Sequence, residues 1–306
     1  MRKVLVATEK PFAAVAVNGI KEIVEGAGYE LVLLEKYTDK AQLLAAVADV
    51  DAVIIRSDIA DEALFEAAKN LKIVVRAGAG FDNINLEAAT AHNVCAMNTP
   101  GQNANAVAEL ALGLMVYAAR NTFNGASGFE LKGKKLGIQG FGNIGRLVAR
   151  LGAAFGMDIY VHDLYAPDIQ EAAKGYTIVD DVRDLYKNCN FISLHIPATP
   201  QTKGSIGREL VASMPKNAVL VNTARKEVIN EAELLEMLAE RADFKYVTDV
   251  APAALEEFAK FEGRFFASPK KMGAQTAEAN INAGLAAARQ IVDFFENGNE
   301  RFRLNK

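Results

Sequence analysis

Three glycines at fixed spacing make up the sequence feature with the most definite chemistry. The motif GFGNIG, residues 140–145, fits G-x-G-x-x-G, follows the apolar run KLGIQ and precedes the helical stretch RLVARLGAAF. In that context the first glycine permits a tight turn, the second lets the backbone approach a pyrophosphate, and the third lets helix and strand pack closely. The N-terminus of the helix offers N–H groups and the positive end of its dipole to phosphates. The motif therefore predicts a dinucleotide site rather than a glycine-rich turn without a ligand.

An acidic residue at the end of the next predicted strand favours one dinucleotide over the other. The run DIYVHD ends at Asp163, about 20 residues after the glycine motif. A carboxylate there accepts hydrogen bonds from the ribose hydroxyls and repels a 2′-phosphate. The sequence therefore predicts NAD as the cofactor rather than NADP.

A lysine pair and a histidine are further groups that could move a proton. Lys270 and Lys271 occupy a corner between a predicted strand and a predicted helix, in FFASPKKMGAQTAEAN. They are either ordinary surface charges or include a proton-transfer group, and the corner alone leaves both interpretations open. His195, in SLHIP, is a second candidate for a base because imidazole titrates near neutral pH.

The elements that must hold these residues alternate along the whole chain. Short β-branched runs are separated by stretches with apolar residues at helical spacing, of which 13–26, 61–69, 104–120 and 276–296 are examples. This alternation predicts an α/β fold with two doubly wound parallel sheets, one before and one after a linker-like segment at 121–135. The predicted strands are 3–8, 29–35, 51–57, 71–78, 93–98, 135–142, 158–163, 191–197, 218–224, 245–252 and 264–269.

Composition narrows the class of protein. A chain of 306 residues is long enough for two buried cores, and a net charge of −4 gives no electrostatic footprint for nucleic acid or a membrane surface. Cys95 and Cys189 lie in or beside apolar runs and are expected to be small buried residues in a reducing compartment. The longest apolar stretch, 107–119, carries Glu109 and is too short to span a bilayer. We expect a cytoplasmic protein with no bound metal.

Five motifs in a fixed order resemble the D-isomer-specific 2-hydroxyacid dehydrogenase family. They are VVRAGAGFDNIN (74–85), NTPGQNANAVAEL (98–110), GKKLGIQGFGNIGR (133–146), FISLHIPATPQT (191–202) and AVLVNTARKEVINEAEL (218–234). The stretch from Arg76 to Asn83 is most similar to the phosphoglycerate dehydrogenase branch, in a short form that lacks a regulatory domain. The resemblance implies NAD-dependent oxidation of D-3-phosphoglycerate to 3-phosphohydroxypyruvate, the entry to serine biosynthesis.

The resemblance also implies how the domains and the subunits are organised. Residues 1–99, completed by a C-terminal helix at 280–306, would form a flavodoxin-like substrate domain. Residues 100–279 would form the Rossmann NAD-binding domain, through which the family usually forms homodimers. The partner molecule would be a small 2-hydroxy or 2-oxo acid, phosphorylated in the branch that matches best.

The catalytic residues implied by the resemblance depart from the family pattern in a coherent way. Arg225 matches the arginine that binds the substrate carboxylate and polarises the reacting oxygen. The family's base is a histidine held by a glutamate, but Lys271 stands at the histidine's position and Ala254 at the glutamate's. A carboxylate beside a lysine would keep it protonated and spoil it as a base, so the loss of both together fits a lysine in this role. Lys271 is expected to move the proton, with His195 as the rival.

Substrate and cofactor contacts follow from the same motifs. The expected substrate-binding residues are Arg56, Ser57, Gly78, Ala79, Gly80 and Asn103. The expected cofactor-binding residues are Gly140, Gly142, Asn143, Ile144, Gly145, Asp163, His195, Pro197, Thr202, Thr223, Ala224, Asp249 and Gly273. Asp249 would hold the carboxamide edge of the nicotinamide.

Two other functions stay open. Asp58 follows the Arg-Ser pair where the family often has a polar or basic residue, and an inward-facing anion would oppose a phosphate. A dehydrogenase for another D-2-hydroxy acid is therefore one alternative. A non-catalytic NAD-sensing binding protein on the same scaffold is the other, which the altered His–Glu pair favours and the retained Arg225 opposes.

Overall fold

The computed structural model describes residues 1–305, and the chain divides into two compact units. Unit 1 comprises residues 1–103 and the C-terminal segment from Gln275 onward, and unit 2 comprises Ala104–Ala274. Each unit is built on one sheet, and all the strand pairs within the two sheets are parallel. This confirms the predicted fold class of two parallel-sheet α/β domains.

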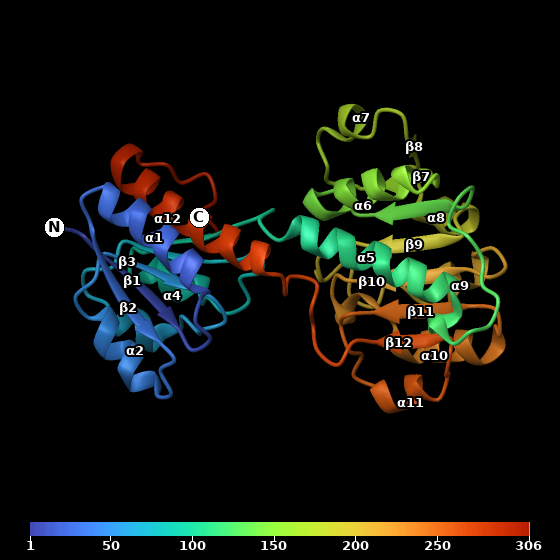
Figure 1. Ribbon diagram of the computed structural model, residues 1–306, viewed down its shortest axis with the longest axis horizontal. Helices are drawn as coiled ribbons and strands as arrows, with labels where there is room; N and C mark the ends of the chain where they lie inside the picture. The colour runs from blue at the N-terminus through green and yellow to red at the C-terminus, as the bar shows by residue number, and fades with distance from the viewer. Residues whose placement is uncertain (306) are drawn as a thin grey trace. The chain divides into compact units, whose positions relative to one another are not determined.

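Unit 1 contains a five-stranded sheet in the order β2-β1-β3-β4-β5. Helices α1 and α12 cover one face of this sheet, and α2, α3 and α4 cover the other (Figure 1). Asp39, Asp61 and Asn85 begin α2, α3 and α4 by accepting hydrogen bonds from backbone N–H groups of the first turn. The elements are β1 Lys3–Thr8, α1 Ala14–Gly26, β2 Glu30–Glu35, α2 Lys40–Val47, β3 Ala52–Ile55, α3 Glu62–Ala67, β4 Ile73–Arg76, α4 Leu86–Ala91, β5 Cys95–Asn98 and α12 Ala277–Asn297.

Helices from the two ends of the sequence lie side by side in unit 1 (Figure 1). A Cβ atom at Gly19 of α1 would come within 2.5 Å of Leu285 in α12, and one at Gly284 would come within 3.1 Å of Ile20. Small residues on both helices therefore allow the close approach that buries their shared apolar faces.

Unit 2 contains a seven-stranded sheet in the order β12-β11-β10-β9-β6-β7-β8. The first strand of this sheet in the sequence is β6, and β7 and β8 follow it toward one edge. The next strand, β9, lies on the other side of β6, so a topological switch point lies between β6 and β9. The two-residue strand β8 was not expected from the sequence. The strands are β6 Lys135–Gln139, β7 Asp158–His162, β8 Thr177–Ile178, β9 Phe191–Leu194, β10 Val219–Asn222, β11 Lys245–Thr248 and β12 Phe265–Ala267. The helices are α5 Ala104–Ala119, α6 Asn143–Ala154, α7 Ile169–Ala172, α8 Val182–Asn188, α9 Arg208–Ser213, α10 Glu231–Glu240 and α11 Leu255–Ala259, with 3₁₀ turns η1 Asn121–Phe123 and η2 Lys226–Val228.

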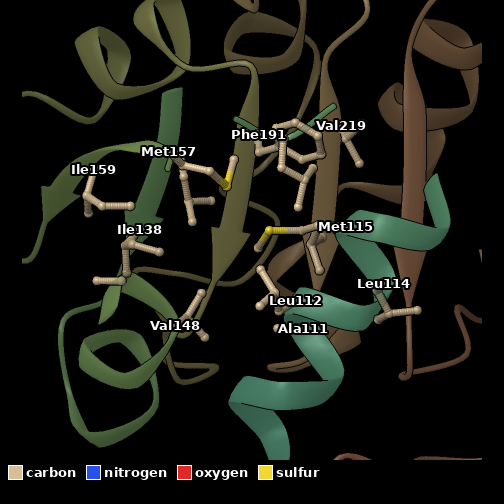
Figure 2. Packing of buried hydrophobic residues seen from close by; sticks show 14 of the residues in the cluster. Ala111, Leu112, Leu114, Met115, Ile138, Val148, Met157, Ile159, Phe191 and Val219 are labelled. Atoms are coloured by element: carbon tan, nitrogen blue, oxygen red, sulfur yellow. The ribbon is translucent and has the colours of Figure 1, made fainter. Parts of the chain in front are cut away.

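One core of unit 2 lies where α5 and α6 pack on the sheet. Figure 2 shows Met115 of α5 and Val148 of α6 among Ile138, Phe191 and Val219 from three strands. The opposite face is covered by α8, α9 and α10 through a second apolar cluster. Burial on both faces explains why the sequences of β9 and β10 are almost entirely apolar.

The linker-like segment 121–135 lies within unit 2 rather than between the units. Phe129 donates its backbone N–H to the carbonyl of Ala119 at 3.0 Å, and Leu131 is buried in the core beneath α5. A Cβ at Gly128 would come within 2.2 Å of the same Ala119 oxygen. The glycines and small polar residues of this segment therefore serve a close crossing over the end of α5.

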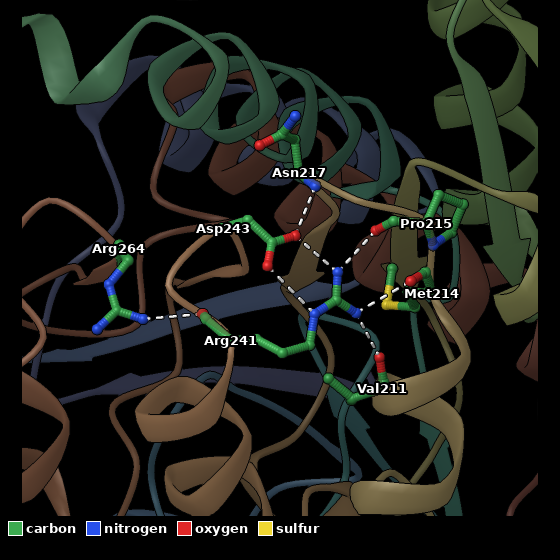
Figure 3. Close-up of polar contacts among 7 residues, drawn as sticks. All are labelled: Val211, Met214, Pro215, Asn217, Arg241, Asp243 and Arg264. Atoms are coloured by element: carbon green, nitrogen blue, oxygen red, sulfur yellow. Dashed lines mark hydrogen bonds and ion pairs between the residues drawn. The ribbon is translucent and has the colours of Figure 1, made fainter.

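Two half-buried arginines, Arg241 and Arg264, donate to backbone carbonyls near the C-terminal ends of helices in unit 2 (Figure 3). Arg241 donates to the carbonyls of Val211 and Met214 at 3.0 Å and of Pro215 at 2.8 Å, and pairs with Asp243 at 2.7 Å. The guanidinium thereby supplies donors to carbonyls at and just after the end of α9, where few backbone N–H groups remain to pair with them.

Neither a membrane span nor a metal cluster occurs within residues 1–305. No helix there is long and apolar enough to cross a bilayer. No group of three or more His, Cys, Asp or Glu side chains is gathered to hold a metal ion. Cys95 and Cys189 are buried and unpaired, as expected, and burial raises their thiol pKa values to about 11 and about 12.

Candidate active site

The glycine motif forms a turn between β6 and α6, next to the switch point of the second sheet. Gly140 has φ +96°, and a Cβ there would lie 2.7 Å from the His195 carbonyl oxygen. A Cβ at Gly145 would lie 2.1 Å from the Gly140 carbonyl oxygen, so the third glycine lets the helix pack against the turn. A Cβ at Gly142 would meet no atom within 4 Å. The second glycine thus leaves an open cradle at the helix N-terminus, as a pyrophosphate requires.

Three neighbouring strands of unit 2 end in a row of buried polar groups. His195, Thr223 and Asp249 each lie one residue past the register pairs that join Leu194, Asn222 and Thr248. Their Nδ1, Oγ1 and Oδ1 atoms are buried and have no hydrogen-bond partner among residues 1–305. Buried polar atoms are rarely left unpaired, because an unmade hydrogen bond costs about 1–3 kcal/mol. The row therefore fits a polar ligand such as the nicotinamide carboxamide, and together with the open cradle it suits NAD.

Asp163 ties the glycine turn to the end of β7. Its Oδ2 accepts from the backbone N–H of Phe141 at 2.6 Å, and its Oδ1 accepts from Tyr165 at 2.7 Å and Ala166 at 3.0 Å. These bonds fix the carboxylate beside the glycine turn. Further lone pairs of the carboxylate would be the acceptors for a ribose.

Asp249 is held by the segment that carries the lysine pair. Its Oδ2 accepts from the backbone N–H groups of Gly273 at 2.6 Å and Met272 at 3.2 Å. The residue is 1% exposed, and burial raises the pKa of its carboxyl group. A Cβ at Gly273 would lie 3.0 Å from Asp249, so a glycine is favoured here for space.

The arginine and the lysine expected to be catalytic approach the same backbone oxygen. Nη1 of Arg225 donates to the carbonyl of Ala224 at 3.0 Å, and Nζ of Lys271 lies 3.5 Å from that oxygen. Lys271 is exposed and Arg225 is half-buried. Lys270 is also exposed, but its carbonyl is tied to the Ser268 hydroxyl at 2.8 Å. Within unit 2 the structure therefore brings Arg225 together with Lys271.

Ala254, which replaces the expected glutamate, begins α11 without a side-chain cap. The carboxylate of Glu231 accepts from the backbone N–H groups of Ala253 at 2.8 Å and Ala254 at 2.9 Å. A glutamate from α10 thus caps this helix in place of a local side chain.

His195 lies with its ring against β9. Its Nε2 is 2.9 Å from the hydroxyl oxygen of Ser193, while burial lowers the imidazole pKa to about 3. Some surface of the residue is exposed, but Nδ1 is buried. An imidazole with so low a pKa stays neutral and is a weak base, which favours the cofactor role over the proton-transfer role.

The remaining expected cofactor residues lie on the loops after β6, β9 and β10. Asn143 and Ile144 open α6, and Ala224 begins the turn before η2. The Thr202 hydroxyl donates to the Pro197 carbonyl at 2.5 Å and accepts from the Thr199 N–H at 2.7 Å, so these residues shape the loop itself.

In unit 1 the Arg56 side chain is held by its own domain. Its guanidinium donates to the carbonyls of Lys10 at 2.9 Å and Pro11 at 3.1 Å and to the Asn280 side chain at 2.5 Å. It also lies 5.0 Å from the centre of the Phe12 ring. Arg56 therefore joins the loop after β1 to the start of α12, at the carboxyl end of β3.

Asp58 does not lie free as an anion. It is 5% exposed and accepts from the Glu9 N–H and the Tyr37 hydroxyl at 2.8 Å each, and from the Arg56 N–H at 3.0 Å. Its charge is used to fix the loops after β1 and β3. The objection that it would repel a phosphate loses its main support.

The other expected substrate residues lie at the carboxyl ends of β4 and β5. Gly78 has φ +150°, and a Cβ there would lie 1.6 Å from Nη1 of Arg76, whose side chain folds over the turn. The Asn98 amide donates to the Ala79 carbonyl at 2.6 Å. Ser57 and Gly80 lie at the ends of β3 and β4, and Asn103 precedes α5 at the end of unit 1.

Sequence reasoning missed three polar residues that shape the site. Asn222 accepts from the Ala224 N–H and donates to the Arg225 carbonyl, both at 3.0 Å, and the Thr248 hydroxyl donates to the Asn222 carbonyl at 2.7 Å. Ser193 contacts His195. All three are polar residues at the ends of buried strands, and that placement is the signal that could have identified them.

Comparisons with known proteins identify the family. Residues 112–265 match the model of the D-isomer specific 2-hydroxyacid dehydrogenase NAD binding domain, which confirms the predicted cofactor. A D-3-phosphoglycerate dehydrogenase of Methanocaldococcus jannaschii is 38% identical over 82% of this chain, which spans 51% of that relative. A hydroxypyruvate reductase of Thermotoga maritima is 36% identical, with 86% of this chain and 90% of the relative covered.

A solved structure extends the similarity to the whole chain. The NAD⁺-bound 3-phosphoglycerate dehydrogenase of Entamoeba histolytica has a TM-score of 0.89 and 48% identity, covering 100% of this chain and 99% of that one. The family match, the relatives and the two parallel-sheet units lead to one conclusion. The chain belongs to the D-isomer-specific 2-hydroxyacid dehydrogenase family.

Proposed function

We propose that this protein interconverts D-3-phosphoglycerate and 3-phosphohydroxypyruvate with NAD as the hydride carrier. The observation that carries the proposal is the approach of Arg225 and Lys271 to one carbonyl oxygen, that of Ala224. It puts a carboxylate-binding cation and a proton-transfer group beside each other. The similarity to the Entamoeba and Methanocaldococcus enzymes supports this substrate in particular.

The roles of the residues follow from their chemistry. Arg225 binds the substrate carboxylate and polarises the oxygen on C2, since a guanidinium can donate to two oxygens at once. Lys271 takes the hydroxyl proton during oxidation and returns it to the carbonyl oxygen during reduction. A nicotinamide held by these residues would supply the hydride chemistry. Asp249 and His195 would hold the carboxamide. In unit 1, Arg56 and Ser57 are the residues whose chemistry suits a phosphate.

The cation pair also explains how a lysine can serve as a base. A neighbouring positive charge disfavours an ammonium ion and so favours the neutral amine that accepts a proton. With Ala254 in place of a glutamate, that position adds no carboxylate beside the lysine, and the Asp249 carboxylate is the anion that acts on Lys271. The two departures from the family pattern therefore act in the same direction.

A second candidate is the reduction of a 2-oxo acid without a phosphate. The Thermotoga relative is a hydroxypyruvate reductase, and the present chain covers 90% of it. The Arg56 guanidinium already donates to three groups within unit 1, which leaves it less able to bind a phosphate.

A substrate series would test the proposal. Purified protein with NADH is offered 3-phosphohydroxypyruvate, hydroxypyruvate or glyoxylate, and NADH absorbance is followed. We expect kcat/KM to be highest for the phosphorylated acid. A preference for hydroxypyruvate would support the second candidate, and tight NADH binding without any turnover would support an NAD-sensing protein.

We also propose a homodimer formed through unit 2. A hollow of about 570 Å³, lined by Arg120, Phe129 and Phe155 among others, lies at the end of α5, and Phe123 nearby is 66% exposed. Exposed aromatic residues around a hollow are typical of subunit contacts. Sedimentation of the protein and of Phe123→Ser would measure the assembly.

A further inference from the structure

Ser193 and His195 form a hydrogen-bonded pair beside the cofactor site. Ser193 is 0% exposed, and its hydroxyl oxygen lies 2.9 Å from Nε2 of His195. Ser193 lies on β9 and His195 follows its last residue, so the two side chains are two positions apart along an extended segment and project to the same side. Ser193 is not among the site residues expected from the sequence.

A neutral imidazole carries one proton, and the serine decides where that proton resides. The imidazole pKa of about 3 keeps the ring neutral at physiological pH. If the serine donates to Nε2, the ring proton is on Nδ1. If Nε2–H donates to the serine instead, Nδ1 is an acceptor and the serine O–H is left over.

The surroundings favour the first arrangement. Ser193 pairs in register with Ile138 and Val221, which belong to the apolar core under α5. Among residues 1–305 its hydroxyl has no partner besides His195. A leftover O–H donor there would be buried without an acceptor, and that costs free energy. In the first arrangement the group without a protein partner is the N–H at Nδ1. It lies in the row with Thr223 and Asp249, where a ligand can accept from it.

We propose that the Ser193 hydroxyl donates to Nε2 of His195 and so fixes the imidazole as the Nδ1–H tautomer, which presents a hydrogen-bond donor to the amide carbonyl of the nicotinamide. Asp249 Oδ1, at the matching position just after β11, is the acceptor for the amide N–H₂. A carboxamide has one acceptor oxygen and one donor nitrogen, so a donor after β9 and an acceptor after β11, on either side of β10, fix which way it faces. Ser193 is thus a positioning residue that acts through His195.

The inference rests on the proposed NAD site but not on the proposed substrate. Its test therefore uses NADH binding and the tautomer itself, both measured without any 2-oxo acid. Failure to reduce 3-phosphohydroxypyruvate would overturn the proposed function and leave this inference standing.

The tautomer can be read from ¹⁵N–¹H spectra of protein labelled at its three histidines. His162 is an internal reference, because its Nδ1 lies 2.9 Å from the Val179 carbonyl and must donate to it. The His195 signals are those missing from His195→Gln. We expect the pattern of an Nδ1–H ring for His195, unchanged between neutral pH and pH 5. An Nε2–H pattern for His195 in the parent protein would overturn the inference.

Substitutions then separate positioning from stability. Ser193→Ala is expected to give a mixture of tautomers and to raise the Kd for NADH roughly three- to tenfold, as the loss of one fixed hydrogen bond implies. Ser193→Thr keeps the hydroxyl and should restore both. Ser213→Ala is the control, because that hydroxyl donates to the Leu210 carbonyl at 2.7 Å, at the end of α9. An unchanged tautomer and Kd in Ser193→Ala would refute the role of the serine.

Discussion

Arg225 and Lys271, separated by 46 positions in the sequence, approach the same acceptor, the carbonyl oxygen of Ala224, at 3.0 Å and 3.5 Å. The Asn222 side chain fixes the turn that carries this carbonyl, through hydrogen bonds to the Ala224 N–H and the Arg225 carbonyl. Asp249 fixes the lysine segment through the N–H groups of Met272 and Gly273. The two cations are therefore positioned by buried polar residues at the ends of two adjacent strands, β10 and β11.

Replacing Lys271 by alanine should remove proton transfer and leave cofactor binding intact. We expect kcat with NADH and the preferred 2-oxo acid to fall by about 10²–10⁴, the usual contribution of a positioned acid or base. Lys270→Ala is the matched control and should keep parental activity. Equal rates in Lys271→Ala and the parent would move the proton-transfer role to His195.

Arg225→Lys keeps the positive charge but loses the planar pair of donors. Because hydrogen bonds to charged groups are worth about 1.5–3 kcal/mol, kcat/KM should fall by roughly 10- to 100-fold. NADH binding, measured by fluorescence titration, should change little. Near-parental kcat/KM would count heavily against a carboxylate-binding role for Arg225.

The second and third glycines of the turn should respond differently to the same added methyl group. Gly142→Ala places its Cβ in open space at φ −79°, so the free energy of unfolding should fall by about 1 kcal/mol or less while NADH binding weakens. Gly145→Ala places its Cβ 2.1 Å from the Gly140 oxygen and should cost about 3 kcal/mol. Urea unfolding and NADH titration of both variants would measure this, and unaltered NADH affinity in Gly142→Ala would contradict a phosphate cradle.

Asp249 should make stability fall as pH rises. Burial raises its carboxyl pKa above the usual value for an aspartate, so the folded protein binds this proton more tightly than the unfolded chain does. Stability from this group is therefore present below the unfolded pKa and is lost as pH rises through the folded pKa. Asp249→Asn cannot ionise, so it should gain stability relative to the parent as pH rises through the folded pKa of Asp249. The same variant should bind NADH more weakly. Asparagine can present its N–H₂ group where Asp249 presents the acceptor oxygen Oδ1, and two donors would then face each other. A pH-independent difference in urea unfolding would show that the carboxyl group does not titrate in this way.

Arg241→Ala should destabilise unit 2 without touching the cofactor site. It removes the guanidinium that donates to three carbonyls at and just after the end of α9 and that pairs with Asp243 (Figure 3), and we expect a loss of about 2–4 kcal/mol. Arg183→Ala is the control, because its pair with Asp181 is at the surface and should contribute nothing measurable. NADH affinity should stay parental in both. A loss of NADH affinity in Arg241→Ala would mean that the contacts around Arg241 are coupled to the cofactor site.

Much of the fold could be predicted because the signals are local. The strand ranges, the glycine turn and the helix at 104–120 follow from short apolar runs, from backbone sterics and from helical periodicity, each readable within a dozen residues. Segment 121–135 was harder, since its glycines and polar residues are typical of a linker. Only contacts of Phe129 and Leu131 with the distant core show that it belongs to unit 2.

The sequence by itself determined the fold class, the family and the positions of Arg225 and Lys271 in their motifs. The tertiary structure alone decided how they are used, because register across parallel strands joins residues far apart in the chain. It places His195, Thr223 and Asp249 in one row, joins Ser193 to His195, and turns Asp58 from an apparent obstacle to phosphate into an internal acceptor. The unmade hydrogen bonds of that row exist only once the strands lie side by side, so no pattern along the chain could have shown them.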